Sequence, residues 1–139
     1  MEKQKYAAIV LAAGSGKRMN SQVHKQYLII QDRPVLYYSL KEFQDSAVDE
    51  IVLVVGKGEE EFCRREIVDK YGISKVKAIV EGGKERYHSV FEGLKQTSDA
   101  DYVLIHDGAR PFVNQDIIRR CMLEVPEYQA CVVGMPVKD

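Results

Sequence analysis

The sequence predicts an α/β fold in which helices cover both faces of a mostly parallel sheet. Along its 139 residues, short apolar runs typical of buried strands alternate with amphipathic segments of helical spacing. One run, 50–55, is almost entirely apolar and β-branched, as expected of a parallel strand that is buried on both faces. Three turns rich in glycine or charge each follow a predicted strand. They therefore belong to the carboxyl edge of the sheet, where such folds bind ligands.

The first third of the chain is expected to supply one strand and one helix. The apolar run 6–10 predicts a strand, and 31–34 reads as a turn. Pro34 suits the first helical position because its fixed φ already matches a helix. Apolar residues then recur at helical spacing in Leu36, Leu40 and Phe43, so we predict a helix over 34–45.

The middle of the chain reads as strand, helix, strand. The strand 50–55 ends at Gly56, and the charged segment 59–70 is predicted to be helical. Two ion pairs at i, i+4 would stabilise this helix, namely Glu60 with Arg64 and Glu61 with Arg65. A further short strand is expected over 77–80.

The last third repeats the alternation. A glycine-rich turn at 81–86 precedes a helix whose one face carries Tyr87, Val90, Phe91 and Leu94. A strand over 101–105 leads into the turn 106–110. Asn114 is expected to cap a helix that runs to about residue 124 and points inward with Ile117, Ile118 and Cys121. A last strand is predicted over 130–133.

Composition limits the classes of function. Residues 1–139 are one domain's worth of chain, with 45% apolar and 29% charged residues and a net charge of −1. There is therefore no global basic field to attract nucleic acid or an anionic membrane, and no apolar run reaches the ~20 residues of a membrane span. The three cysteines, an odd number without C-x-x-C spacing, indicate a reducing, cytoplasmic compartment.

The turn after the first strand has the features of a phosphate site. Gly14 and Gly16 let the backbone approach an anion closely, and Lys17 and Arg18 add positive charge. Met19 replaces the third glycine of the dinucleotide fingerprint, and the Walker spacing is also absent. On the glycines alone, an ordinary strand–turn remains an equal alternative.

Taken together, the three carboxyl-edge loops suit nucleotidyl transfer. They combine several cations with one strand-end carboxylate, Asp107, and Mg²⁺ prefers one or two carboxylates plus phosphate oxygens. A phosphate that attacks a nucleotide needs orientation and charge neutralisation rather than a general base. Two alternatives stay open, because Asp107 is also a common turn residue before glycine and His106 also fits a buried core position.

Four motifs closely resemble the 2-C-methyl-D-erythritol 4-phosphate cytidylyltransferases of the non-mevalonate isoprenoid pathway. They are Leu11–Met19 (LAAGSGKRM), Lys25–Tyr27 (KQY), Gly82–Val90 (GGKERYHSV) and His106–Pro111 (HDGARP). The resemblance implies a Rossmann-like three-layer α/β/α nucleotidyltransferase domain. Its implied reaction transfers CMP from CTP to the erythritol phosphate with release of pyrophosphate, assisted by Mg²⁺.

The same resemblance implies roles for individual residues. Arg18 and Lys25 would be catalytic, because they neutralise the α-phosphate and the leaving pyrophosphate. Asp107 and Arg110 would face the metal and the sugar-alcohol phosphate, with Asp107 as the metal ligand. CTP would be bound by Ala12, Ala13, Gly14, Ser15, Gly16, Lys17, Arg18, Lys25, Gly82, Gly83, Arg86 and Ser89.

Two departures from the family pattern qualify this reading. His24 stands where the family usually has proline, which leaves Lys25 in place but loosens the loop. Family members also continue past Asp139 with a threonine, an arm that builds a homodimer and a later lysine. The expectation is thus an incomplete domain that binds CTP and turns over poorly. Ribitol-5-phosphate cytidylyltransferase and a CTP-binding fragment without turnover remain the alternatives.

Overall fold

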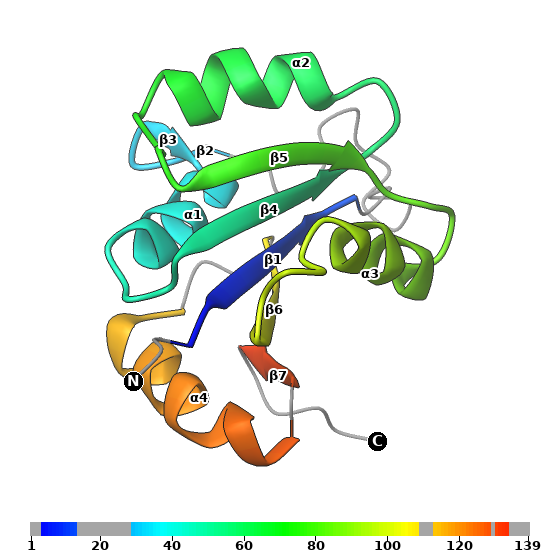
Figure 1. Cartoon of the computed structure of the whole chain (residues 1–139). Helices are drawn as coiled ribbons and strands as arrows, with labels where there is room; N and C mark the ends of the chain where they lie inside the picture. The colour runs from blue at the N-terminus through cyan, green and yellow to red at the C-terminus, as the bar shows by residue number, and fades with distance from the viewer. Residues whose placement is uncertain (1–3, 14–28, 109–112, 129, 134–139) are drawn as a thin grey trace.

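The main sheet has β1 (Tyr6–Ala12) at its centre. The computed structural model describes residues 4–13, 29–108, 113–128 and 130–133. Within these ranges, five strands form one sheet in the order β5–β4–β1–β6–β7, and every pairing is parallel (Figure 1). The other four strands are β4 (Glu50–Val55), β5 (Val76–Glu81), β6 (Tyr102–Asp107) and β7 (Ala130–Val133). The predicted parallel sheet is therefore confirmed.

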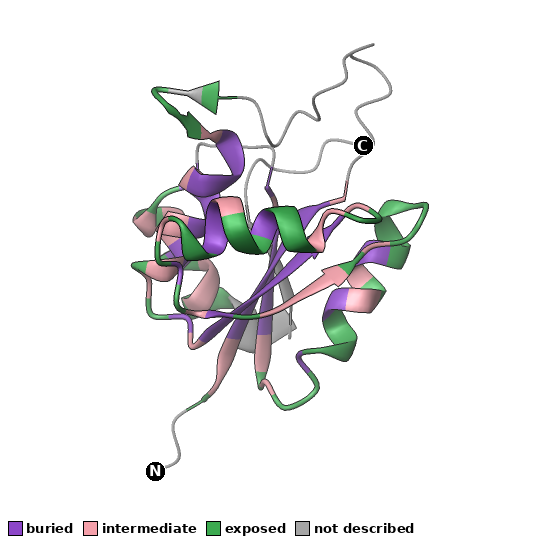
Figure 2. Ribbon diagram, turned by 90° about the horizontal axis from the view of Figure 1, so that it is seen from above, coloured by how far each residue is buried: buried purple, intermediate pink, exposed green. Residues whose placement is uncertain are grey.

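Helices cover both faces of this sheet, as predicted. Alternate residues of β1 and β4 point to opposite faces, and each set belongs to a separate apolar cluster. One cluster includes side chains from helices α1 (Val35–Gln44) and α4 (Gln115–Tyr128), and from the helical segment 60–69. On the other face, α3 (Arg86–Lys95) packs through Val90. Figure 2 shows the buried strands between these outer layers.

Helix α3 lies very close to the sheet because it has a glycine at the contact. A Cβ added to Gly93 would lie 2.7 Å from Ile9 Cγ2 and 3.3 Å from Val54 Cγ2, so no larger residue fits without displacement. Ser89 and Gly93 are the buried residues of this helix. The backbone of Gly93, rather than an apolar side chain of α3, thus contacts the sheet at this point.

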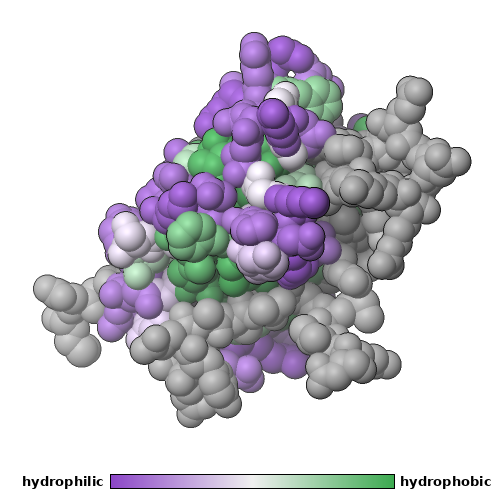
Figure 3. Space-filling view, turned by 90° about the vertical axis from the view of Figure 1, so that its right-hand side faces the viewer, coloured by the Kyte–Doolittle hydropathy of each residue, from purple (hydrophilic) through white to green (hydrophobic). Residues whose placement is uncertain are grey.

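Three of the four residues on the apolar face predicted for α3 point away from the sheet, and only Val90 packs against it. Tyr87, Phe91 and Leu94 are 67%, 59% and 42% exposed. Together with Arg86, His88 and Val90 they line an open hollow of about 770 Å³. Figure 3, which views the molecule from the side that bears α3, shows apolar surface among the polar atoms.

Helix α1 begins one residue later than predicted. Pro34 has an extended conformation (φ −66°, ψ 148°) and pairs with Ile29 across the hairpin of β2 (Ile29–Ile30) and β3 (Arg33–Pro34). The two residues of the turn, Gln31 and Asp32, both have positive φ, which suits the right-handed twist of a tight hairpin. Proline therefore stands before the helix rather than in its first turn.

The charged helix predicted over 59–70 is interrupted in its winding. It consists of α2 (Glu60–Cys63) and a π-helical segment, η3 (Arg64–Asp69). Because a π-turn bonds i to i+5, side chains four residues apart no longer align. Arg65 accordingly pairs with its neighbour Glu66 at 2.9 Å rather than with Glu61 as predicted.

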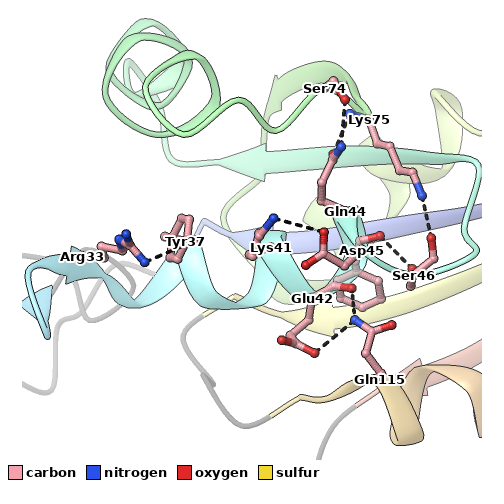
Figure 4. Close-up of polar contacts among 11 residues, drawn as sticks. Arg33, Tyr37, Lys41, Glu42, Gln44, Asp45, Ser46, Ser74, Lys75 and Gln115 are labelled. Carbon is pink, nitrogen blue, oxygen red and sulfur yellow. Dashed lines mark hydrogen bonds and ion pairs between the residues drawn. The ribbon is translucent and has the colours of Figure 1, made fainter.

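Polar contacts attach the C-terminal end of α1 to two other parts of the fold (Figure 4). Gln44 accepts a hydrogen bond from the Lys75 backbone at 2.9 Å and donates one to the Ser74 hydroxyl at 2.8 Å. Gln115 Nε2 donates to the Glu42 carbonyl at 2.6 Å. These bonds connect α1 to the start of β5 and to the start of α4.

Helix α4 and its cap agree with the prediction, although the helix is longer. The Asn114 side chain accepts a hydrogen bond from the Ile117 backbone at 2.9 Å, and Ile118 is 1% exposed. The helix continues to Tyr128. No helix among the described residues is long and apolar enough to cross a bilayer.

The amino edge of the sheet is closed by an ion-pair cluster. The Glu50 carboxylate, whose side chain is 8% exposed, lies 2.6 Å from both Lys5 Nζ and Lys77 Nζ. The hydrogen bonds that the Lys5 ammonium donates to Asp99 and Glu50 raise the pKa of Lys5, and the bond from Lys5 lowers the pKa of Asp99. A buried carboxylate needs such partners, since an unpaired charge would be strongly destabilising there.

We predict that Gly93→Ala destabilises the protein although alanine is the better helix former. Helix propensity alone favours alanine by roughly 0.5–1 kcal/mol. Overpacking against Ile9 should outweigh it, at about 1–3 kcal/mol. Denaturant unfolding measures the net change, and the double variant with Ile9→Ala should show favourable coupling because it removes the contacted atoms. A Gly93→Ala protein more stable than the parent would contradict the close approach of α3.

Candidate functional site

The order in which strands are added to the sheet reverses at β1, which creates a topological switch point at the carboxyl edge. From β1 the chain proceeds outward through β4 and β5, and then returns to place β6 on the other side of β1. Leu11 of β1 lies beside Asp107 of β6, so the carboxyl ends of these two strands are adjacent. Crevices at such switch points are where open α/β sheets bind ligands.

The turn after β5 lies against the end of β1. A Cβ added to Gly82 would collide with Ser89 Oγ and would lie 2.7 Å from Ala13 Cβ. The Gly82 N–H also donates a 2.7 Å hydrogen bond to the Val55 carbonyl, which fixes the turn to β4. Glycine at this position therefore brings Ala13, Gly82 and Ser89 together, three residues that the sequence analysis expected to bind the same ligand.

Helix α3 positions the polar residues of this turn. Its first residue is Arg86, and its buried Ser89 faces Gly82. The Glu85 backbone N–H donates a hydrogen bond to His88 Nδ1 at 3.3 Å, which is one half of a capping box. Gly83 is close to the His88 side chain, so it too lies against the start of the helix.

Asp107 is the last residue of β6 and not part of the following loop as the sequence had suggested. The strand covers Tyr102–Asp107, and the Gly108 N–H donates a 2.7 Å hydrogen bond to the Leu11 carbonyl. Arg86 Nη1 lies 3.9 Å from Asp107 Oδ2, with side-chain exposures of 56% and 36%. The structure thus joins two predicted site residues that are 21 positions apart and lie on different elements.

His106 has a core position and not a catalytic one. The residue is fully buried, its Nε2 lies 3.1 Å from the Ser39 hydroxyl, and its ring packs 5.7 Å from the ring of Phe43. The core alternative of the sequence analysis is therefore confirmed.

The donor set suits a divalent cation that arrives with phosphate. The described residues contain no group of three or more His, Cys, Asp or Glu side chains arranged to hold a metal. Asp107 is the partly exposed carboxylate at the switch point. A single carboxylate fits Mg²⁺ that takes its other ligands from phosphate oxygens and water, rather than a protein-enclosed metal site.

Two glutamates, Glu60 and Glu81, interact near the end of β5, the outermost strand of the sheet. Burial, followed by a hydrogen bond with Glu81, raises the pKa of Glu60. Glu81 Oε2 also accepts a 3.0 Å hydrogen bond from the Gly58 backbone. These groups hold the turn after β4 against the end of β5.

Ala12, at the end of β1, is 2% exposed, so its side chain belongs to the core. The remaining predicted site residues, and His24, lie outside the described residues. They are Gly14, Ser15, Gly16, Lys17, Arg18, Lys25 and Arg110.

Sequence reasoning missed the contribution of Val54. Its Cγ1 would lie 3.0 Å from a Cβ on Gly82, and its Cγ2 would lie 3.3 Å from one on Gly93. The residue thus sits beneath both the turn and the helix that form the site. An apolar strand residue has no sequence signal that would distinguish this role from ordinary core packing.

Comparison with known proteins identifies relatives over nearly the whole chain. Residues 6–139 match the family profile described as 2-C-methyl-D-erythritol 4-phosphate cytidylyltransferase. The proteins of that name from Lachnoclostridium phytofermentans and Lachnospira eligens are each 53% identical to the chain, over 136 and 133 residues. These alignments cover 98% and 95% of the chain but 58% of each relative, so the chain spans less than two thirds of their length.

A solved structure agrees with this assignment. The 4-diphosphocytidyl-2C-methyl-D-erythritol synthase of Anaerococcus prevotii superimposes with a TM-score of 0.72 at 33% sequence identity. The match covers 88% of the chain and 51% of that structure. The three-layer α/β/α arrangement described above is thus shared with a protein of that name.

We predict that Gly82→Ala weakens nucleotide binding much more than Gly56→Ala. The new methyl group must displace Ser89 or Ala13, which changes the shape of the turn at the point where the ligand would contact it. At Gly56 the new group would meet only the Glu59 carboxylate, 2.8 Å away at the end of a flexible side chain. Calorimetric titration with CTP and Mg²⁺ should show a loss of at least about tenfold for Gly82→Ala alone. Equal affinities would mean that the turn does not contact the ligand.

Proposed function

Because the chain belongs to the 2-C-methyl-D-erythritol 4-phosphate cytidylyltransferase family, we propose that its carboxyl-edge site binds CTP. The complete protein would transfer CMP to 2-C-methyl-D-erythritol 4-phosphate. The products would be 4-diphosphocytidyl-2-C-methyl-D-erythritol and pyrophosphate.

The close approach of Gly82 to Ala13 and Ser89 carries this proposal. The Gly82 N–H is already bonded to the Val55 carbonyl, so the other backbone groups of the turn and the Ser89 hydroxyl would contact the ligand. A pyrimidine edge, with its own donors and acceptors, is the part of CTP that this arrangement would read. A site that hydrogen-bonds a specific edge rejects ligands that lack it, because its polar groups would be left unpaired.

The proposed reaction is a single displacement at the α-phosphorus of CTP. An oxygen of the erythritol phosphate forms the new bond, and the bond from the α-phosphorus to the β-bridging oxygen breaks. The electron pair of that bond leaves with pyrophosphate. The attacking group is already anionic, so no general base is needed, in agreement with the buried position of His106.

Charge neutralisation would then be the main task of the protein. We assign the triphosphate to the loop 14–18, and the α-phosphate and the leaving pyrophosphate to Arg18 and Lys25. Cations placed where negative charge develops in the transition state stabilise it more than the bound substrates. The start of α3 would add Arg86 to this group, since it lies at the same edge of the sheet.

Asp107 and Arg110 would serve the second substrate and the divalent cation. Asp107 would hold the cation, which when bound supplies neutralisation of the triphosphate oxygens. Arg110 would bind the phosphate of the sugar alcohol by a bidentate contact. We further propose a homodimer in the cytoplasm, in line with the family resemblance and with the three cysteines.

CTP should bind more tightly than ATP or NAD in the presence of Mg²⁺. We expect a preference over ATP of at least about tenfold, or about 1.4 kcal/mol in binding free energy. Calorimetric titration of each nucleotide measures it. The variant Ser89→Ala should narrow this preference, because it removes the hydroxyl beside the turn. If ATP binds as tightly as CTP, the cytidine assignment is wrong.

Arg18→Ala and Lys25→Ala should each reduce turnover of the complete protein by about 10²–10³-fold. Removing one cation from the transition state should leave the folded state intact, so thermal unfolding should change little. Arg65→Ala and Lys70→Ala, which remove exposed charges on and after η3, are the matched controls. Pyrophosphate release is the assay, and near-parental rates in both site variants would refute the phosphate roles.

A further inference from the structure

The contact between Arg86 and Asp107 has an unusual place in the fold. Arg86 begins α3, which packs on β1 and β4, whereas Asp107 ends β6 on the other side of the switch point. Their side chains meet at 3.9 Å beside the end of β1, where the first glycine loop starts. The pair therefore spans the position at which we propose that the triphosphate and its cation bind.

Arg86 and Asp107 can each separate from the other and pair with a different ion. Its distance lies at the long limit of an ion pair, and the two side chains are 56% and 36% exposed. Solvated pairs of this kind contribute little to stability, so their separation is not opposed by the fold. The arginine can also pair equally well with a phosphate, because its fork of donors matches both anions.

Arg86 and a divalent cation compete for the same carboxylate. Both are positively charged, and a cation bound to Asp107 would stand a few ångströms from the guanidinium. Their repulsion is relieved only when Arg86 moves to another anion. The triphosphate supplies that anion at the moment when the cation arrives.

We propose that Arg86 acts as an exchangeable counter-ion for Asp107, which makes cation binding depend on the nucleotide. In the free protein it neutralises the carboxylate and keeps the affinity for divalent cations low. When the nucleotide binds, Arg86 turns to the phosphates and no longer competes with the cation for Asp107. The inference rests on the proposed function, since it takes the nucleotide and the role of Asp107 from there.

The consequence is a positive coupling between the two ligands. Each should increase the affinity of the protein for the other by the same factor, as linkage requires. Couplings between sites are typically about 5–150-fold. Removing the competition should raise the affinity for the cation alone and reduce the effect of the nucleotide on it.

The test measures Mn²⁺ binding to the nucleotide-free protein by electron paramagnetic resonance, with Mn²⁺ in place of Mg²⁺. Arg86→Gln should bind Mn²⁺ at least about fivefold more tightly than the parent protein. Arg86→Lys, which keeps the charge, should stay near the parent. Lys84→Gln removes an equal charge from an exposed position two residues earlier and should change the affinity less than about twofold.

A second set of measurements identifies the carboxylate and the coupling. Adding Asp107→Asn to Arg86→Gln should abolish the gain in Mn²⁺ affinity. Adding CTP should raise Mn²⁺ affinity in the parent protein by a larger factor than in Arg86→Gln. Thermal unfolding checks that each variant is folded, which we expect because Arg86 and Lys84 are exposed.

The outcomes separate this inference from the proposed function. The inference is overturned if Arg86→Gln binds free Mn²⁺ no better than the parent, if Lys84→Gln gains as much, or if the gain survives Asp107→Asn. None of these three results depends on nucleotide selectivity. Conversely, equal binding of CTP and ATP would refute the cytidine assignment and leave the Mn²⁺ measurements unaffected.

Discussion

The short distance between α3 and the sheet is the constraint on which the candidate site depends. Gly93 allows this short distance because it leaves room for Ile9 and Val54. Gly82 likewise allows the turn after β5 to lie close to Ala13 and Ser89 at the carboxyl edge. Val54 contacts both glycine positions, so one strand residue supports the helix and the turn together. The packing of α3 therefore places Ser89 and Arg86, two residues that we propose bind the ligand.

The two edges of the sheet have opposite characters. At the amino edge, the buried Glu50 carboxylate lies 2.6 Å from both Lys5 Nζ and Lys77 Nζ. At the carboxyl edge, Asp107 Oδ2 lies 3.9 Å from Arg86 Nη1, and the Asp107 side chain is partly exposed. Short ion pairs to a buried carboxylate close one end of the molecule, while a longer pair to a partly exposed carboxylate lies at the end where we propose that ligands bind.

Most of the elements were predictable because their signals are local. A run such as 50–55 predicts a buried parallel strand wherever it stands, and Asn114 caps α4 as its side-chain chemistry suggests. The predictions were wrong where contacts with another element determine which face of a helix is buried. Periodicity predicts one apolar face for α3, yet the fold exposes Tyr87, Phe91 and Leu94 of that face. Ser89 and Gly93 lie against the sheet instead, because the glycine permits the closer approach.

By itself, the sequence determined the alternation of elements, the three loops at the carboxyl edge and the family resemblance. Each depends on residue type and spacing along the chain. Only the tertiary structure decided that Gly82 touches Ala13 and Ser89, that His106 is a core residue bonded to Ser39, and that Arg86 meets Asp107. These contacts join residues far apart in the chain, and they exist because parallel strands bring distant carboxyl ends to one edge.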